Sequence, residues 1–234
     1  MANEVFSDHA PRLIISDIDG TLLDRNHRVP KRNREAVARA VAAGSEFALA
    51  TGRPFRWIMP VLEQLTVRPV CVTSNGAVIY DSAEDRVLSA HELSPEALAE
   101  TVKVAAKVLE PHGGVGFGAE RAGGSVLDPV EELFVVESHY SENALFEGFG
   151  LVSVGELVSR PAVKLLIRNT AFSAPELYEL IAPHIDSELA HVTYSISEGV
   201  LEVAAPNVTK RRGVKWLAEH HGIAREDIIA FGDM

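Results

Sequence analysis

The stretch LIISDIDGTLL, residues 13–23, decides the fold of this chain. Its first four residues, 13–16, have the composition of a short strand that is buried on both faces, as in parallel sheets. Two aspartates, Asp17 and Asp19, follow directly. In an extended chain, residues i and i+2 point to the same side, so we expect the two carboxylates to face one ligand.

Buried strands alternate with amphipathic helices around this stretch. Predicted strands occupy residues 13–16, 46–50, 70–73, 77–80 and 227–231. Predicted helices occupy residues 30–44, 55–62 and 209–221. Such alternation indicates an α/β fold with a doubly wound, Rossmann-like parallel sheet that carries helices on both faces.

A second domain interrupts this pattern. From about residue 82 the chain mixes helices with strand-like runs, among them 134–136 and 163–168, and the strand–helix alternation returns near the end. We therefore predict a core domain made of residues 1–81 and 189–234. Residues 82–188 are predicted to form an inserted α+β domain. The run VLEVAA (200–205) is assigned to the returning core.

The composition excludes several classes of protein. The formal net charge is −11, with 33 acidic against 22 basic residues, so the chain is not expected to bind nucleic acid or an anionic membrane. No apolar run approaches the ~18 residues of a membrane helix, and the N-terminus does not resemble a signal peptide. One cysteine, Cys71, permits no internal disulfide and suggests a cytoplasmic location.

Polar residues follow several of the predicted core strands. Asp17, Thr51 and Asp233 lie at or just beyond strand ends, and Lys210 lies near the start of the helix before the last strand. In open parallel sheets, ligands bind at these carboxyl ends, so the four residues are expected to converge. Two close carboxylates repel each other unless a cation joins them, and hard oxygen ligands in small number suit Mg²⁺. Asp17 could then be a nucleophile and metal ligand, and Asp19 a general acid.

Four segments together resemble the motifs of the haloacid dehalogenase superfamily. They are DIDGT (17–21), ALATGRP (48–54), Lys210 in NVTKRRGVKWL, and IIAFGD (228–233). Their order, the position of the insertion and the SNGA stretch (74–77) resemble the Cof-type sugar-phosphate phosphatases, which carry a type IIB cap domain. The resemblance implies that Asp17 attacks phosphorus and forms an aspartyl-phosphate. It also implies that Asp19 protonates the leaving alkoxide and then activates water.

The resemblance also implies the binding residues. Thr51, the Gly52 backbone N–H and Lys210 are expected to hold the phosphoryl oxygens. Mg²⁺ is expected on the Asp17 carboxylate, the Asp19 backbone carbonyl and Asp233. Arg53 and Asn75 are candidates for contact with the substrate or the cap, although turn geometry explains both residues nearly as well.

The fourth motif departs from the family pattern. It normally runs Gly-Asp-x-x-Asn-Asp, and the sequence ends at Met234, directly after Asp233. We expect that the recorded sequence omits a tail, because a domain rarely ends at the terminus of a buried strand.

These observations lead to one main hypothesis and two alternatives. The main hypothesis is a Mg²⁺-dependent phosphatase of small phosphorylated metabolites such as sugar phosphates, acting as a monomer or homodimer. A hexose-phosphate phosphomutase would use the same residues but return the phosphoryl group to a sugar. A non-catalytic protein that binds phosphorylated ligands is the third reading, and it has no need of an acid at residue 19.

Overall fold

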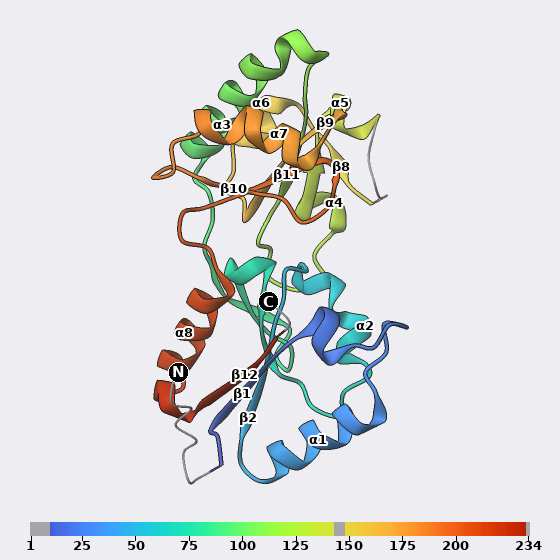
Figure 1. Ribbon diagram of the computed structural model, residues 1–234, viewed down its shortest axis with the longest axis vertical. Helices are drawn as coiled ribbons and strands as arrows, with labels where there is room; N and C mark the ends of the chain where they lie inside the picture. The colour runs from blue at the N-terminus through green and yellow to red at the C-terminus, as the bar shows by residue number, and fades with distance from the viewer. Residues whose placement is uncertain (1–9, 143–147, 233–234) are drawn as a thin grey trace. The chain divides into compact units, whose positions relative to one another are not determined.

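The structure is a computed structural model, and it describes residues 10–142 and 148–232. The chain divides into two compact units. Unit 1 contains the residues up to Ser89 and those from Thr209 onward, and unit 2 contains Ala90–Val208. Figure 1 shows a separate β-sheet with its own helices in each unit. One domain is therefore inserted into another, which is the arrangement that the sequence pattern indicates.

Unit 1 is built on a six-stranded sheet of order β12-β1-β2-β3-β4-β5. Its strands are β1 (Leu13–Asp17), β2 (Glu46–Ala50), β3 (Val70–Thr73), β4 (Val78–Asp81), β5 (Arg86–Ala90) and β12 (Ile228–Phe231). Strands β12, β1, β2 and β3 are parallel, and β4 returns antiparallel to β3. The strands expected near residues 13, 46, 70, 77 and 227 are all confirmed.

Helices lie on both faces of this sheet, as Figure 1 shows. They are α1 (Lys31–Ala42), α2 (Met59–Leu62) and α8 (Lys210–His220), with helical turns η1 (Ile18–Leu22), η2 (Phe55–Trp57), η3 (Ser74–Gly76) and η6 (Arg225–Asp227). The doubly wound, Rossmann-like architecture of the core is therefore confirmed.

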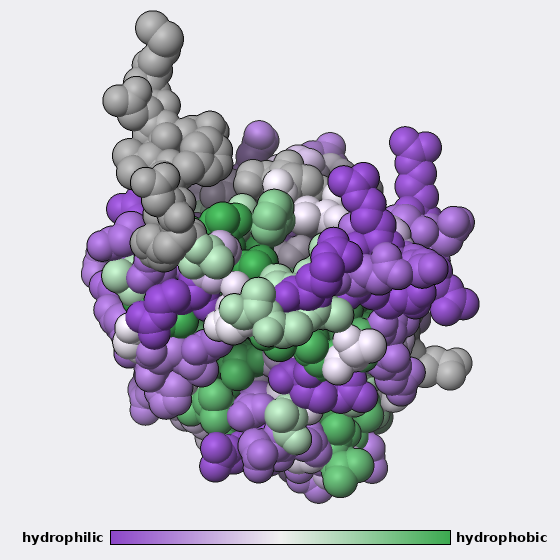
Figure 2. Space-filling model, turned by 90° about the horizontal axis from the view of Figure 1, so that it is seen from below, coloured by the Kyte–Doolittle hydropathy of each residue, from purple (hydrophilic) through white to green (hydrophobic). Residues whose placement is uncertain are grey.

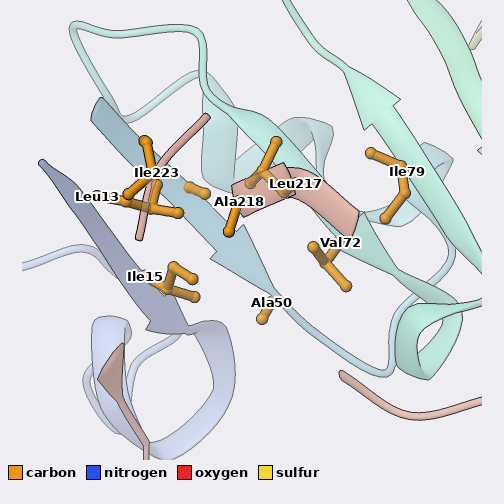
Figure 3. Packing of buried hydrophobic residues seen from close by; sticks show 9 residues of the cluster. Leu13, Ile15, Ala50, Val72, Ile79, Leu217, Ala218 and Ile223 are labelled. Carbon is orange, nitrogen blue, oxygen red and sulfur yellow. The ribbon is translucent and has the colours of Figure 1, made fainter. Parts of the chain in front are cut away.

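The core between the sheet and α8 follows from the alternation of side chains along each strand. Alternate residues of β1 and β2 face α8, and small alanines on β2 allow the helix to pack closely. The buried cluster, shown in Figure 3, contains Leu13, Ile15, Ala48, Ala50, Val72, Ile79, Leu217, Ala218 and Ile223. This packing fixes α8, and with it Lys210, against the carboxyl ends of the strands.

Unit 2 is an α+β structure with a sheet of order β10-β11-β9-β6-β7-β8. Its strands are β6 (Gly116–Glu120), β7 (Phe134–Val136), β8 (Gly150–Leu151), β9 (Lys164–Ser173), β10 (His191–Thr193) and β11 (Glu198–Ala204). Its helices are α3 (Pro95–Leu109), α4 (Val130–Leu133), α5 (Ser138–Ser141), α6 (Val154–Val158) and α7 (Ala174–Ile181), with turns η4 (Glu110–His112) and η5 (Ala182–His184). The Ser94 hydroxyl caps α3 by accepting from the N–H of Ala97 at 3.2 Å, as its sequence indicates.

The boundaries of the insertion differ from the expected residues 82 and 188. Strand β5 extends the sheet of unit 1, so residues 82–89 belong to the core. Strands β10 and β11 belong to the sheet of unit 2, and the run 200–205, assigned from sequence to the core, pairs there as β11 with β9. A buried apolar strand has the same composition in either sheet, so its partner cannot be read from the run itself.

Charged and polar side chains cover most of the face shown in Figure 2, with smaller hydrophobic areas between them. Among the helices in the described part of the chain, none is long and apolar enough to cross a membrane. Cys71 of β3 is buried, and burial raises the pKa of its thiol, so it is not suited to act as a nucleophile.

Candidate active site

Asp17 is the last residue of β1, and its side chain is held at both oxygens. The backbone N–H of Ile18 donates to Oδ1 at 2.8 Å, and the Lys210 ammonium lies 3.0 Å from Oδ2. The Asp17 side chain is 13% exposed and that of Lys210 is 30% exposed. A carboxylate oxygen pair offers about four lone-pair directions, so these contacts orient the group and leave acceptor capacity for a ligand.

Lys210 reaches Asp17 because it is the first residue of α8. Thr209 caps the helix, and its hydroxyl accepts from the N–H of Arg212 at 3.1 Å. The N-terminus of the helix therefore points its partial positive charge at the same region as the ammonium group. Both features favour an anionic ligand beside Asp17.

Two glycines set the position of α8. A Cβ on Gly76, whose φ is +100°, would overlap the carbonyl oxygen of Thr209. A Cβ on Gly213 would overlap Cγ1 of Val72. The close approach of the helix to β3 and to the turn after it therefore depends on the absence of side chains at these positions.

Thr51 and Gly52 follow β2 beside the end of β1. Asp17 pairs with Ala50 in the parallel register, so Thr51 comes one residue beyond it. Thr51 is buried, and its hydroxyl accepts from the N–H of Arg53 at 3.1 Å. A Cβ on Gly52 would lie 2.9 Å from Oδ1 of Asn75, so the Asn75 side chain packs directly over Gly52.

The turn after β3 is tied to the same segment. The backbone N–H of Asn75 donates to the carbonyl oxygen of Thr51 at 3.1 Å, and that of Ser74 donates to the carbonyl oxygen of Arg53 at 2.9 Å. Ser74 and Asn75 have φ values of +48° and +58°, which is the left-handed region. Asn75-Gly76, a sequence typical of hairpin turns, does form one, since β3 and β4 pair as an antiparallel hairpin across it.

Asp19 lies in the turn after β1 and is paired with Arg53. Arg53 donates from Nε to Oδ2 at 2.9 Å and from Nη2 to Oδ1 at 2.5 Å. The Asp19 side chain is 53% exposed, so a ligand can reach it. This contact was missed from sequence, where Arg53 was considered only for the substrate or the cap. Arg53 lies three residues beyond β2, which neighbours β1, and this position could have indicated that it lies near Asp19.

The two aspartates therefore each have a cation of the protein itself. Lys210 offsets the charge of Asp17, and Arg53 offsets that of Asp19. Two carboxylates separated by a single residue repel each other, and the sequence analysis expected a bound cation to offset this repulsion. The two basic side chains offset part of it.

The residues present suit a hard divalent cation. The Asp17 carboxylate and the Asp19 backbone carbonyl are both oxygen donors from one turn, which is the donor chemistry that Mg²⁺ prefers when it keeps several waters. Asp233, the third expected ligand, lies outside the described residues. Within the described ranges, no group of three or more His, Cys, Asp or Glu residues could by itself hold a metal ion.

Thr21, the last residue of the DIDGT motif, adds a feature that sequence reasoning did not use. Its hydroxyl is buried and has no hydrogen-bond partner among residues 10–142 and 148–232. Buried hydroxyls are normally satisfied, so this oxygen is available to a water or ligand group beside the turn.

Comparison with known proteins agrees with the fold. The chain is 25% identical over 230 residues to the 5-amino-6-(5-phospho-D-ribitylamino)uracil phosphatase YitU of Bacillus subtilis, covering 95% of this chain and 80% of that protein. The crystal structure of TM0651 from Thermotoga maritima superimposes with a TM-score of 0.73 at 22% identity, covering 96% of this chain and 80% of that one.

A second solved structure, that of the HAD subclass IIB sugar phosphatase BT4131, gives a TM-score of 0.68 at 21% identity, covering 95% of this chain and 80% of that one. These likenesses extend across both units, so the fold is the subclass IIB fold of a Rossmann-like core with an inserted cap. The model of the haloacid dehalogenase-like hydrolase family matches residues 14–234. By this match and by its fold, the chain belongs to the haloacid dehalogenase-like hydrolases.

Proposed function

We propose that the protein is a Mg²⁺-dependent phosphatase that hydrolyses small phosphorylated metabolites, sugar phosphates or related compounds, through an aspartyl-phosphate. One observation carries the proposal: the Lys210 ammonium lies 3.0 Å from the Asp17 carboxylate at the carboxyl end of a parallel sheet. The pairing supports an anion site that contains its own nucleophile. The names of the relatives, phosphatases of small phosphorylated compounds among them, are consistent with this function.

The first half-reaction uses Asp17 and Asp19. A carboxylate oxygen of Asp17 attacks phosphorus, the bond to the substrate oxygen breaks, and the carboxylic acid of Asp19 gives its proton to the leaving alkoxide. A positioned acid is worth roughly 10²–10⁴ in rate, because an alkoxide is a poor leaving group. In the second half-reaction the Asp19 carboxylate takes a proton from water, which attacks phosphorus and releases phosphate and free Asp17.

The phosphoryl oxygens are held by groups around the ends of β1 and β2. The Thr51 hydroxyl, the Gly52 backbone N–H and the Lys210 ammonium are the proposed donors. Lys210 pairs with Asp17. When a phosphoryl group arrives, the ammonium serves both the nucleophile and the group that is attacked, which offsets their mutual repulsion.

Mg²⁺ is proposed to bind to the Asp17 carboxylate, the Asp19 backbone carbonyl and Asp233. When bound, it supplies positive charge that reduces the repulsion between the anionic nucleophile and the anionic phosphate. Asp19 would contribute only its backbone oxygen to the metal, so its side chain remains available for proton transfer.

Arg53 is proposed to orient Asp19 in the free enzyme. Its two hydrogen bonds hold the ionised carboxylate, whereas the first half-reaction needs the protonated acid. Substrate binding therefore has to draw Arg53 away from Asp19, and the phosphoryl oxygens are a suitable new partner for a guanidinium fork. Asn75, packed over Gly52, is proposed to contact the substrate from the other side.

Unit 2 is proposed to act as the cap that selects the leaving group and excludes water. The chain passes from Asn75 through all of unit 2 before it returns at Lys210, so unit 2 is bounded in sequence by segments of the site.

We further propose a cytoplasmic enzyme, monomeric or homodimeric, whose partner is a small phosphorylated substrate and which binds neither nucleic acid nor membrane.

Replacement of the nucleophile tests the proposal. Asp17→Asn keeps the size of the side chain and removes its nucleophilic charge, so turnover of an aryl phosphate should fall at least 10³-fold. Circular dichroism should show an unchanged fold. Near-normal turnover by this variant would reject the covalent mechanism.

Product analysis distinguishes a phosphatase from a mutase. Hexose 1-phosphate should yield free phosphate, and formation of the 6-phosphate would instead identify a mutase.

A further inference from the structure

A buried arginine in unit 2, Arg168, has no ion-pair partner among the described residues. Arg168 lies on β9, where it pairs with Gly116 of β6 on one side and Val200 of β11 on the other. It is 9% exposed, and its Nε and Nη1 are buried without a hydrogen-bond partner in the part of the chain that the structure describes. A buried cation of this kind is costly unless something pairs with it.

Carboxylates in the described part of unit 2 do not bond to Arg168. Within the described residues, Arg168 makes no ion pair with a carboxylate. Glu137, which also lies in this region, is committed to the backbone: its Oε1 accepts from the N–H of Phe117 at 2.9 Å and of Tyr140 at 2.8 Å, and its Oε2 accepts from the N–H of His139 at 2.8 Å.

Tyr140 does not neutralise the arginine either. Its hydroxyl is buried without a partner, and burial raises the pKa of this group to about 12, although the charge of Arg168 opposes the rise. The phenol is therefore neutral near pH 7. Within the described ranges, neither Glu137 nor Tyr140 forms an ion pair with Arg168.

Arg168 lines a cavity of about 230 Å³ together with His112, His139 and Asn169. The cavity also borders the backbone at Thr170 and Ala171. Two imidazoles and a guanidinium are the side chains that donate hydrogen bonds to oxyanions, and no carboxylate is among the lining residues. The chemistry of the cavity is thus that of an anion site.

The wall of the cavity is held rigidly. The Asn169 amide donates to the carbonyl oxygens of His112 at 3.1 Å and Gly114 at 2.8 Å, and its own oxygen accepts from the N–H of Ala171 at 2.8 Å. The His112 ring packs edge-on against Phe172 with 5.2 Å between ring centroids. Asn169 therefore does not compete for a ligand but fixes the loops that carry the histidine and the cavity rim.

We propose that this cavity binds a small tetrahedral oxyanion, either free phosphate or the phosphoryl group of a metabolite. The Arg168 guanidinium supplies the charge, and the imidazoles of His112 and His139 supply directed N–H donors. The site lies within unit 2, and it does not depend on the chemistry of Asp17. Its function is binding, with no bond made or broken.

Histidine resonances of the full chain test the proposal. Protein carrying ¹³C-labelled histidine is titrated with inorganic phosphate at constant pH and ionic strength, and the signals are assigned with His112→Asn and His139→Asn. Both signals should shift and saturate in the wild type. In Arg168→Met the affinity should fall at least about tenfold, since a hydrogen bond to a charged group is lost. Lys103→Met, which removes an exposed lysine on α3, should leave the titration unchanged.

A second ligand and a conservative variant complete the test. Glucose 6-phosphate in place of phosphate distinguishes the sources, because a tighter titration with the ester identifies a phosphorylated metabolite. Arg168→Lys keeps the charge without the planar fork, so it should give an intermediate affinity even if the methionine variant does not fold. Histidine signals that do not move, or that move equally in the Arg168 variants, would overturn the proposal. Asp17→Asn should abolish turnover and leave these shifts intact, which separates this site from the proposed activity.

Discussion

The Arg53 guanidinium binds the Asp19 carboxylate through two hydrogen bonds, from Nε to Oδ2 and from Nη2 to Oδ1. The two residues come from the segments after neighbouring parallel strands, β2 and β1. A guanidinium held in this way fixes the direction of the carboxylate more strictly than a lysine could, because it is planar and donates at two points.

The contact predicts a specific loss on substitution. Arg53→Met should lower kcat/KM for an aryl phosphate by about 10²-fold, because the variant loses both the partner of Asp19 and the guanidinium that is proposed to move to the phosphoryl oxygens. Arg53→Lys should recover only part of this loss. Arg34→Met, which removes an exposed arginine from α1, is the matched control and should behave as the wild type. Steady-state kinetics measure all three, and full activity of Arg53→Met would show that Asp19 needs no such support.

Lys210 should matter more for the transition state than for the fold. We expect Lys210→Met to lower kcat about 10²- to 10³-fold, the typical cost of removing one donor to developing negative charge. Arg211→Met changes the next residue of α8, which is exposed, and should alter kcat less than twofold on the ordinary scatter of surface substitutions. Equal effects of the two variants would mean that only the net charge of the helix start matters.

Removal of divalent metal should abolish turnover. Dialysis against a chelator is expected to reduce the rate at least about 10²-fold, and added Mg²⁺ should restore it, because the charge of Asp17 then again has a second cation beside Lys210. Stopped assays with and without Mg²⁺ measure this. Full activity in the chelator would require a different source of positive charge at the phosphate.

Gly76 affects both the stability of unit 1 and the position of α8, which carries Lys210. Gly76→Ala places a methyl group on the Thr209 carbonyl at a φ of +100°, so we expect a loss of about 3 kcal/mol or more in the free energy of unfolding. Gly44→Ala is the matched control: its φ is +97°, but nothing lies within 4 Å of the added carbon, so only backbone strain of about 1–2 kcal/mol should appear. Urea unfolding separates the clash from the strain, and similar losses would show that α8 shifts freely.

The ion pair between Lys164 and Glu202 makes unit 2 sensitive to acid. Their charged atoms lie 2.8 Å apart, and the side chains are only 11% and 16% exposed. Burial alone would raise the pKa of Glu202, but the charge of Lys164 and hydrogen bonds from Lys164 and Ser195 outweigh it and lower the pKa. A carboxyl with a lowered pKa stabilises the fold at pH values above its unfolded value of about 4.3, and this contribution is lost as the pH falls through the folded value.

Glu202→Gln should therefore cost about 3 kcal/mol at pH 7, because it removes the carboxylate of a buried ion pair, and progressively less below pH ~4. The exposed pair of Lys215 and Glu219, at 3.7 Å, supplies the control, since Glu219→Gln should change stability by at most about 0.5 kcal/mol. Unfolding curves across pH test both, and a cost for Glu202→Gln that does not decrease in acid would contradict the assignment.

Elements whose residue pattern lies within one continuous segment could be predicted from the sequence. Local pattern predicted the strand before Asp17 and the helix that begins near residue 209, and turn chemistry predicted the turn at Asn75-Gly76. The pairing of β11 was not, because a buried strand does not reveal which sheet it will join. The bond from Arg53 to Asp19 and the cavity around Arg168 depend on side chains from separate elements, and no single segment contains that information.

The insertion of one unit into the other has a consequence for biosynthesis. Unit 2 is one continuous piece, Ala90–Val208, whereas unit 1 needs β12 and α8 beside β1. During translation the ribosome therefore releases all of unit 2 before unit 1 can fold completely, and the segments of the candidate site that are made first lack α8 and β12 until then. Ribosome-bound chains that are halted once Val208 has left the exit tunnel should already resist protease within unit 2, while their first eighty or so residues are still cleaved.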